Sequence, residues 1–307
     1  MQKGTAMGFS HVSVMLDETI EQLNIKPDGI YVDGTLGGAG HASEVCRRLS
    51  ENGRFIGIDQ DAAAIEAAGE RLKPFGDKVT IVRNNYCNMK AELERLGISK
   101  VDGILLDLGV SSYQLDTPER GFTYKFEGPL DLRLNPQKGI SAAERLKGIS
   151  REELRGMLEE NADEPYAEKI ADKIVSNERR GKKIETTTQL KEAIEEALAF
   201  TPEKERKEAV KKSCQRVFQA LRIDVNNEYE VLYTFLEKLP DVLAPGGRVA
   251  ILTFHSGEDR LVKKFFKEQK KAGVYSDVAA DVVRPSAEEC NRNPRARSTK
   301  MRWAVRA

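Results

Sequence analysis

Between residues 30 and 108, short apolar runs alternate with amphipathic segments, and this alternation constrains the fold more than any other feature of the sequence. The predicted strands cover 30–33, 53–59, 79–83 and 101–108, and the predicted helices cover 41–50, 62–72 and 89–96. Parallel strands require crossover connections, which helices supply along a right-handed path. The pattern therefore predicts an α/β fold with a parallel sheet.

The rhythm changes near residue 110, and from 139 to about 239 the sequence predicts only helices. Their start signals are S-x-x-E or T-x-x-Q patterns at 141–144, 150–153 and 186–189. A further helix is expected to begin with Thr201 as its N-cap and Pro202 in its first turn.

Strand character returns in PGGRVAILTFH at 245–255, and the last eight residues predict a final strand. The simplest organisation is one doubly wound α/β domain, residues 1–112 and 216–307, interrupted by an all-helical insertion, residues 113–215.

Composition excludes several classes of protein. The 307 residues include 49 basic and 49 acidic side chains, so a nucleic-acid contact must come from a local cluster. The four cysteines show no C-x-x-C spacing and no pair of histidines has metal-ligand spacing, so no metal site is expected. With no apolar run of about 18 residues and no signal-peptide pattern, we expect a cytoplasmic protein without a membrane partner.

The first predicted strand leads into YVDGTLGGAGHAS, residues 31–43, which has four glycines between 34 and 40. Glycines at this density permit a sharp turn or the close approach of a ligand. Asp59 ends the next strand, where a carboxylate can accept hydrogen bonds from ribose hydroxyls, as in the nucleotide-binding half of a Rossmann-like fold. The alternative is a loop whose glycines only permit tight packing.

Three classes of ligand could bind the glycine loop. A phosphate-binding P-loop is excluded because no Lys-Ser/Thr pair follows the glycines. The dinucleotide pattern fits Gly38 and Gly40, but Ser43 then takes the position of the third glycine, and Asp33 is unfavourable beside a pyrophosphate. S-adenosylmethionine carries an ammonium and a sulfonium and has no phosphate, so the residues favour it, while nicotinamide or flavin binding stays open.

Six further segments join the glycine loop, which makes seven in order along the chain. They are HVSVMLDE (11–18), VDGTLGGAGHAS (32–43), LLDLGVSSYQLD (105–116), FEGPLDLR (126–133), RVFQALRIDVNNE (216–228), PGGRVAILTFHSGEDRLVK (245–263) and NPRARSTKMR (293–302). Together they resemble the bacterial ribosomal RNA small subunit methyltransferase H family. The resemblance implies a Rossmann-like class I methyltransferase fold and methylation of the N4 amine of a cytidine in the decoding region of 16S ribosomal RNA.

The resemblance also implies a set of cofactor contacts. The positions that match the family's S-adenosylmethionine site are Ala39, Gly40, His41, Asp59, Tyr86, Asp107 and Gln114. The chain departs from the family at Ser13 and Tyr113, where proline is usual, and at Gly257, where leucine is usual. Tyr113 lies in the segment expected to flank the cofactor, so the local turn there is in question.

Transfer to an exocyclic amine requires a group that holds the amine and accepts its proton. In amino-methyltransferases generally, an Asp/Asn/Ser-Pro-Pro-aromatic motif after the fourth strand supplies this acceptor. Asp107 has that position here without the prolines, so the match is one of position, and Asp107, Ser111 and Ser112 are the candidates. His255, after the fifth strand, is a further candidate, although it can equally serve only to hold the strand end. Asp259 and Arg260 can form a local ion pair.

Local charge indicates where RNA would bind. From 291 to 307 the sequence has six basic residues and no acid, and Arg295, Arg297 and Lys300 are the candidates for phosphate contacts. RRGKK at 179–183 and the basic segment 201–222 are further clusters, and a solvated surface is the alternative for each. The helical insertion is expected to help bind RNA.

Two other functions stay open. A ribosome-assembly factor with a non-catalytic methyltransferase fold would bind the small ribosomal subunit without modifying it, and a nicotinamide-dependent oxidoreductase would use the same glycine loop. The sequence leaves the oligomeric state open, a dimer included.

Overall fold

The computed structural model describes residues 13–307, so the first residues of the segment HVSVMLDE lie outside the described part. The chain divides into two compact units, described here separately. The first runs to Gly109 and resumes at Thr234, and the second is Val110–Tyr233. The second unit continues past the expected boundary at 215 because α10 (Glu203–Asn226) is one continuous helix whose apolar face belongs to that unit's core.

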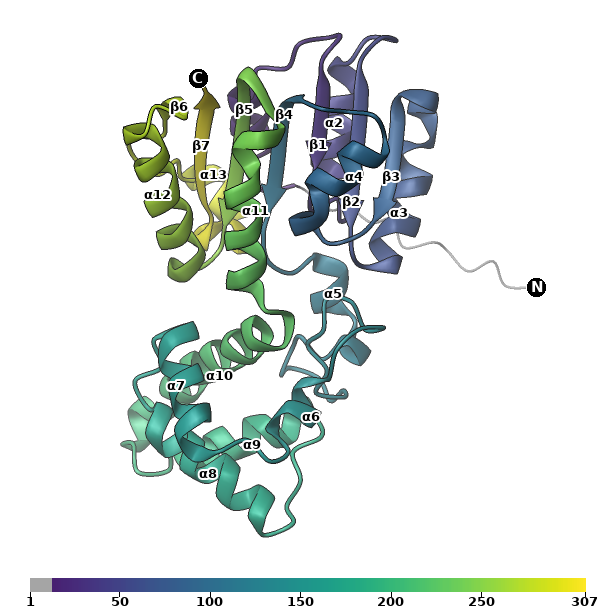
Figure 1. Ribbon diagram of the computed structural model, residues 1–307. Helices are drawn as coiled ribbons and strands as arrows, with labels where there is room; N and C mark the ends of the chain where they lie inside the picture. Colours follow the sequence, from purple (N-terminus) through teal and green to yellow (C-terminus); the bar gives the residue numbers. More distant parts are fainter. Residues whose placement is uncertain (1–12) are drawn as a thin grey trace, which may run out of the picture. The chain divides into compact units, whose positions relative to one another are not determined.

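A seven-stranded sheet of order β3-β2-β1-β4-β5-β7-β6 forms the centre of the first unit (Figure 1). The strands are β1 (Ile30–Asp33), β2 (Arg54–Asp59), β3 (Val79–Arg83), β4 (Val101–Asp107), β5 (Leu243–Thr253), β6 (Tyr275–Val278) and β7 (Lys300–Arg306). The first five are parallel, and β7 is antiparallel to both of its neighbours. The order reverses between β1 and β4, which confirms the doubly wound, Rossmann-like sheet.

Helices cover both faces of this sheet (Figure 1). One face carries α1 (Leu16–Leu23), α2 (Gly40–Arg48) and α3 (Ala62–Leu72), and the other carries α4 (Met89–Arg95), α12 (Ser256–Lys271) and the part of α11 (Glu228–Val242) that follows Thr234. Adjacent residues of one strand, such as Phe55 and Ile56, are therefore both buried. Burial on both faces explains why the strands are continuous apolar runs.

The sequence did not predict β6 or the connecting elements around it. This strand has four residues and lies at the sheet edge, where it pairs only with β7. Its sequence, YSDV, carries two polar residues, so the apolar period that identifies a strand is absent. The remaining elements of this unit are η1 (Lys73–Lys78), η2 (Tyr86–Asn88), α13 (Ala287–Arg292) and η4 (Pro294–Ser298).

The second unit is helical in all its regular elements. These are α5 (Ser112–Asp116), η3 (Pro118–Arg120), α6 (Ala142–Leu146), α7 (Arg151–Ala162), α8 (Ala167–Arg179), α9 (Thr187–Ala197), α10 and the first part of α11. Its core is a cluster of apolar side chains that includes Leu154, Ile170, Ile194 and Phe218.

The predicted helix starts are confirmed in part. Ser141 and Thr186 each form a complete capping box, whereas Ser150 accepts a hydrogen bond from Glu153 without a reciprocal bond. The expectation for Thr201 was wrong: Pro202 is the N-cap of α10, and the Thr201 hydroxyl donates back to the carbonyl of Leu198. Among residues 13–307, no helix combines the length and the apolarity that crossing a bilayer requires.

Candidate active site

Three neighbouring parallel strands each end on an aspartate. Asp59 ends β2, Asp33 ends β1 and Asp107 ends β4, and these strands are adjacent in the sheet. Ligands of open α/β sheets bind outside the carboxyl ends of the strands, where the strand order reverses. The three carboxyl groups therefore lie at the edge where this fold builds its site.

The glycine loop after β1 serves both packing and access. A Cβ atom on Gly40 would lie 1.9 Å from the Ser13 hydroxyl, and one on Gly34 would lie 2.5 Å from a methyl of Leu106, so both glycines are needed for tight packing. Gly38 differs, because a Cβ there would meet no atom of residues 13–307 within 4 Å. Ala39 takes a left-handed φ of 57° and precedes α2. The packing alternative thus accounts for Gly34 and Gly40 and leaves the open face of Gly38 unexplained.

Asp33 and Asp59 organise this loop through hydrogen bonds. Oδ1 of Asp33 accepts from the backbone nitrogen of Thr35 at 3.0 Å, and Oδ2 of Asp59 accepts from that of Gly37 at 2.8 Å. Burial nevertheless raises the pKa of Asp33 to about 7 and that of Asp59 to about 6, and in Asp33 the nearby Asp59 charge adds to the rise. Each carboxylate oxygen retains a lone pair, so Asp59 can still accept from a ligand hydroxyl.

Asp107 is the least satisfied of the three. Within residues 13–307, its buried Oδ1 has no hydrogen-bond partner, and its Oδ2 lies 3.7 Å from Nδ1 of His41. Burial, together with the charges of Asp33 and Glu258, raises the pKa of Asp107 to about 8. A buried carboxylate oxygen without a partner costs free energy, so this group is poised to accept a hydrogen bond or a positive charge from a ligand.

His41 is buried, with 5% of its surface exposed, and its Nε2 lies 3.0 Å from the carbonyl oxygen of Val14. The His41 side chain is therefore in contact with protein atoms and is not left to solvent. Tyr86 lies in η2, where its ring packs edge-on against Phe235 with centroids 5.6 Å apart. Both side chains thus have structural contacts within the first unit.

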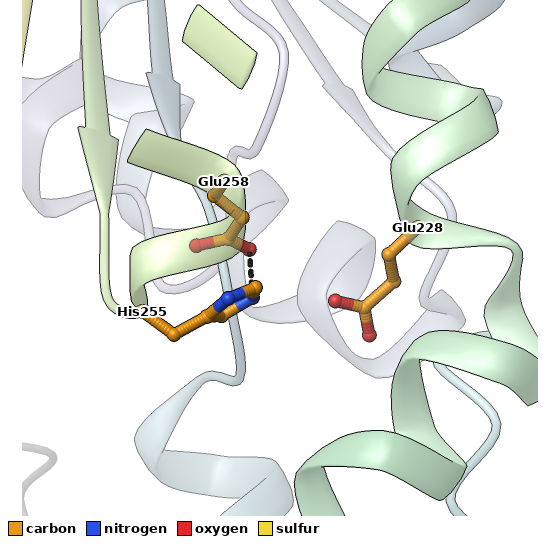
Figure 2. Close-up of side chains that lie close together, drawn as sticks. All are labelled: Glu228, His255 and Glu258. Carbon is orange, nitrogen blue, oxygen red and sulfur yellow. Dashed lines mark ion pairs between the residues drawn. The ribbon is translucent and has the colours of Figure 1, made fainter. Parts of the chain in front are cut away.

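His255 precedes α12 at the end of β5. Its Nε2 lies 3.1 Å from Oε1 of Glu258, and Figure 2 shows this pair in the first turn of the helix. The other carboxylate oxygen of Glu258 accepts a hydrogen bond from the backbone nitrogen of Phe254 at 3.0 Å. Glu258 therefore joins the strand end to the histidine and contributes to the raised pKa of Asp107.

Ser111 and Gln114 belong to the second unit and contact each other. The Ser111 hydroxyl accepts from the backbone nitrogen of Gln114, and the Gln114 side chain accepts from that of Ser111, which completes a capping box at α5. Ser112 and Tyr113 form the first turn of this helix, so the segment with the Tyr113 departure is helical and the tyrosine is 40% exposed.

The three candidate RNA contacts differ in environment. Arg295 and Arg297 are exposed in η4, whereas the Lys300 ammonium lies 3.6 Å from the carboxylate of Asp259 and its side chain is 20% exposed. Asp259 also pairs with the buried Arg302 at 2.7 Å. This interaction with β7 takes the place of the local pair with Arg260 that the sequence suggested, because antiparallel β7 brings Arg302 over the start of α12.

Sequence reasoning missed two residues of this site. Thr35 donates its hydroxyl to Asp33 and accepts from the backbone nitrogen of Asp107 at 2.6 Å, so it connects the ends of β1 and β4. Glu258 was also missed, although an acid three residues after an N-cap position is the usual sign of a side chain that returns to the helix start. No local pattern marks Thr35, since its partner lies 72 positions away.

Comparison with known proteins places this site in a family. The MraW methylase family matches residues 8–307. A ribosomal RNA small subunit methyltransferase H 1 of Lachnoclostridium phytofermentans is 58% identical over 100% of this chain and 84% of its own length. Its namesake in Agathobacter rectalis is 55% identical over 100% of this chain and 88% of its own length. The chain belongs to the MraW methylase family.

Proposed function

We propose that this chain methylates the N4 amine of a cytidine in the decoding region of 16S ribosomal RNA, with S-adenosylmethionine as the methyl donor. Family membership supports the donor and the reaction class, and the relatives named ribosomal RNA small subunit methyltransferase H support the substrate. Such a substrate places the protein in the cytoplasm with the small ribosomal subunit as its partner. The observation that carries the proposal is the unsatisfied carboxylate of Asp107 at the end of β4.

The residues at the strand ends suit a cationic cofactor. Asp33, Asp59 and Asp107 have raised pKa values, and none of them pairs with a lysine or arginine within residues 13–307. A ligand with an ammonium and a sulfonium would bring the positive charge that these carboxyl groups lack. The open face of Gly38 leaves room for such a ligand to approach the loop.

Seven residues are proposed to hold the cofactor: Ala39, Gly40, His41, Asp59, Tyr86, Asp107 and Gln114. Asp59 supports this role by its free lone pairs, and His41 by its fixed position beside Asp107. Gln114 rests on the family resemblance and on its placement in the α5 capping box. The bound cofactor supplies an electrophilic methyl group on a sulfonium.

The protein's own task is to position a weak nucleophile. The amine of cytosine is delocalised into the ring, so it must be held about 3–3.5 Å from the methyl carbon and in line with the bond that breaks. Asp107 is proposed to accept a hydrogen bond from this amine and then its proton. Ser111 and His255 are the other candidates for the acceptor, and His255 is already oriented by Glu258.

The substrate side of the proposal rests on exposed cations. Arg295 and Arg297 are proposed to contact phosphates, with Lys300 in a weaker role because it already faces Asp259. Replacing Arg295 and Arg297 together by alanine should weaken RNA binding and flatten its salt dependence by about 0.7 per lost contact. Unchanged RNA binding would leave these arginines as a solvated surface, and cofactor affinity serves as the control.

One experiment tests the function directly. Small subunits that lack the modification, and the corresponding naked RNA, are incubated with the protein and S-adenosylmethionine, and the modified nucleoside is mapped by mass spectrometry. N4-methylcytidine at one decoding-region position is the expected product. Binding to subunits without methyl transfer would instead support the non-catalytic assembly factor, and binding of NADH in preference to S-adenosylmethionine would support the oxidoreductase.

A further inference from the structure

We propose that one surface of the helical unit binds a single-stranded stretch of RNA, with Phe126 stacking on a base and with Lys125, Arg179, Arg180 and Lys183 contacting phosphates. The proposal rests on the proposed function only in taking the methylated RNA as the natural ligand. None of these five residues belongs to the candidate active site.

Phe126 is exposed on a backbone that is firmly held. Its side chain is 62% exposed, the largest exposed fraction among the large hydrophobic side chains of residues 13–307. Its carbonyl oxygen accepts from the Thr187 hydroxyl at 2.8 Å, and the Gly128 carbonyl accepts from the Thr187 backbone nitrogen at 2.9 Å. A rigid aromatic ring in solvent loses little conformational entropy when a base stacks on it.

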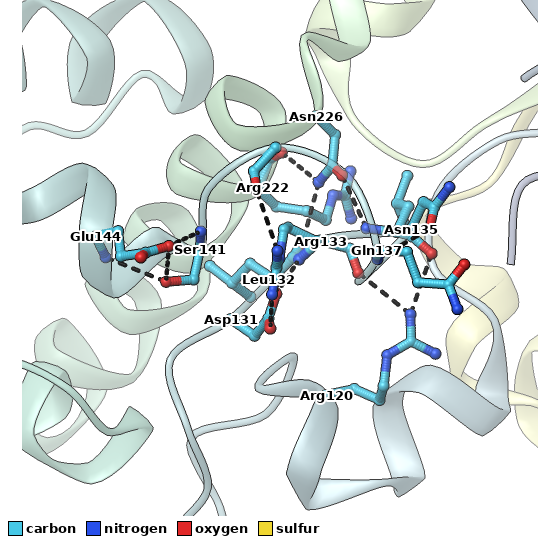
Figure 3. A network of polar contacts seen from close by, with 12 residues as sticks. Arg120, Asp131, Leu132, Arg133, Asn135, Gln137, Ser141, Glu144, Arg222 and Asn226 are labelled. Carbon is cyan, nitrogen blue, oxygen red and sulfur yellow. Dashed lines mark hydrogen bonds and ion pairs between the residues drawn. The ribbon is translucent and has the colours of Figure 1, made fainter.

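The part of the loop that follows Phe126, residues 131–137, is also held by hydrogen bonds, as Figure 3 shows. Leu132 has a left-handed φ of 64°, and Asn226 holds the backbone that follows it, donating to the Leu132 carbonyl and accepting from the Leu134 backbone nitrogen, each at 2.8 Å. Arg120 donates to the carbonyl oxygens of Arg133 and Leu134. A Cβ on Gly128 would lie 2.1 Å from the Pro118 carbonyl, so the loop cannot relax at that position either.

Hydrogen bonds place this loop beside the RRGKK turn. The Leu130 backbone nitrogen donates to the Glu185 carbonyl at 2.9 Å, and Pro129 forms an antiparallel bridge with Thr186. Residues 184 and 185 connect Lys183 of the turn to Thr186, so the Cα atoms of Lys183 and Thr186 lie at most about 11 Å apart. The aromatic ring and the basic turn thus belong to one surface.

The cations on this surface are exposed and uncommitted. Lys125, Arg179, Arg180 and Lys183 form no ion pair with any residue between 13 and 307, whereas Lys182 of the same turn pairs with Glu196 at 2.8 Å. Arg179 and Arg180 also line a hollow of about 430 Å³ together with Arg151, Asp172, Val175 and Ser176. Arg151 is neutralised there by Asp172 and Glu168, so the positive charge available to a ligand comes from the other two arginines.

This combination matches the chemistry of single-stranded RNA. Proteins bind single strands with aromatic side chains that stack on bases and with cations that follow the phosphates. Duplex RNA would leave the ring unused, because its bases are already stacked and are read by shape. Glu127 is the one acid next to the ring on this loop, and its charge opposes a phosphate.

The stacking contact is tested with the full chain and two oligonucleotides, ten adenosines and ten abasic residues. Phe126→Ala should weaken binding of the adenosine decamer about tenfold and leave the abasic decamer unaffected. Phe126→Trp should bind the adenosine decamer as well as the parent chain does. The fluorescence of this tryptophan should be quenched by the adenosine decamer and not by the abasic decamer. Phe126→Leu keeps the apolar surface and should behave as Phe126→Ala does. Equal losses for both decamers, or none for either, would overturn the stacking role.

The phosphate contacts are tested by charge. Replacing Arg179, Arg180 and Lys183 by alanine should weaken both decamers and flatten the salt dependence by about 0.7 per residue. Lys182→Ala is the matched control and should change neither, since that lysine is already paired. Glu127→Gln should tighten binding. A triple variant that binds with the salt dependence of the parent would overturn the assignment of the turn.

Thr187 is a positioning residue on this account. Thr187→Val removes the hydroxyl that holds Phe126 and should reduce adenosine-decamer affinity, while Thr187→Ser should retain it.

These experiments distinguish failure of the surface assignment from failure of the proposed function. If the chain methylates ribosomal RNA but the Phe126 series binds both decamers equally, the surface assignment fails alone. If decamer binding follows the predicted pattern but no methylated nucleoside forms, the proposed function fails alone.

Discussion

Ala39 and Leu132 are both non-glycine residues in the left-handed region, with φ of 57° and 64°, but their surroundings differ. Around Leu132 the polar side chains that shape the loop have partners: Asp131 pairs with Arg133, and Asn226 bonds to the backbone of Leu132 and Leu134. Around Ala39, among residues 13–307, the nearby acids Asp33 and Asp59 accept only backbone or hydroxyl hydrogen bonds, and one oxygen of Asp107 has no hydrogen-bond partner.

The difference shows that backbone strain alone does not identify a ligand site. Both loops hold a strained residue in place, and both do so with close backbone packing. The loop around Leu132 is electrostatically complete, so its strain supports a rigid scaffold. At the edge around Ala39, Arg71 donates to the carbonyl of Gly38, and none of the three acids pairs with a lysine or arginine of residues 13–307, so a cofactor can supply their counter-charge. Uncompensated buried charge, more than strain, distinguishes the two regions.

The largest expected effect comes from removing the orphan carboxylate. Asp107→Asn should lower the rate of methyl transfer at least a hundredfold, because the proton acceptor is lost. The free energy of unfolding should stay constant or increase, since an amide, unlike the buried carboxyl group, never has to ionise as pH rises. Stopped-assay kinetics and urea unfolding measure the two quantities.

Asp102 provides the matched control at the opposite end of the same strand. It accepts from the Ile30 backbone nitrogen and pairs with Lys26, so Asp102→Asn should affect stability and leave turnover nearly unchanged. Turnover of Asp107→Asn at the parent rate would exclude this residue as acceptor.

The second prediction concerns pH. The pKa values of Asp59, Asp33 and Asp107 are raised to about 6, 7 and 8, so between pH 5 and 8 the unfolded chain has released protons that the folded chain still binds. The free energy of unfolding of the cofactor-free protein should therefore fall as pH rises through this window. Urea unfolding at several pH values measures it.

Asp107→Asn should make this decline shallower throughout the window and leave little of it between pH 7 and 8, where Asp59 and Asp33 are already largely ionised. Saturating S-adenosylmethionine should have a similar effect, because a cation favours the ionised carboxylates. A decline that is identical in the parent and the variant would show that Asp107 titrates normally.

The third prediction tests whether the hydrogen bonds of the loop around Leu132 contribute to stability and not to cofactor binding. Asn226→Ala removes hydrogen bonds to Leu132, Leu134 and Arg222, and should lower the free energy of unfolding by about 2 kcal/mol. Affinity for S-adenosylmethionine should not change. Asn135→Ala in the same loop removes only an exposed bond to Gln137 and should have little effect. A loss of cofactor affinity would contradict the proposed division of roles.

The smallest expected effect is at a helix cap. Thr186→Ala should destabilise the protein by about 1 kcal/mol, because the side chain that caps α9 is lost. Thr186→Ser keeps the hydroxyl and serves as the control. Thermal unfolding measures both, and an alanine variant as stable as the serine variant would show that the cap contributes nothing.

Sequence patterns predicted most of the elements because those patterns act over short distances. The strands ending at Asp33 and Asp59 and the helix over Ala62–Leu72 were predicted nearly to the residue from apolar period and flanking breakers. The capping boxes at Ser141 and Thr186 were also predicted, since a cap involves residues three apart. The edge strand β6 was not, because its pairing with β7 decides its conformation.

The sequence by itself determined the α/β class, the glycine loop, and the aspartates that end the first, second and fourth strands. Only the tertiary structure decided which aspartates lie on adjacent strands, how Thr35 connects β1 to β4, and that Asp259 faces Arg302. The physical reason is that local conformation depends on neighbours along the chain, whereas burial, and with it the pKa of Asp107, depends on partners that distant segments bring together.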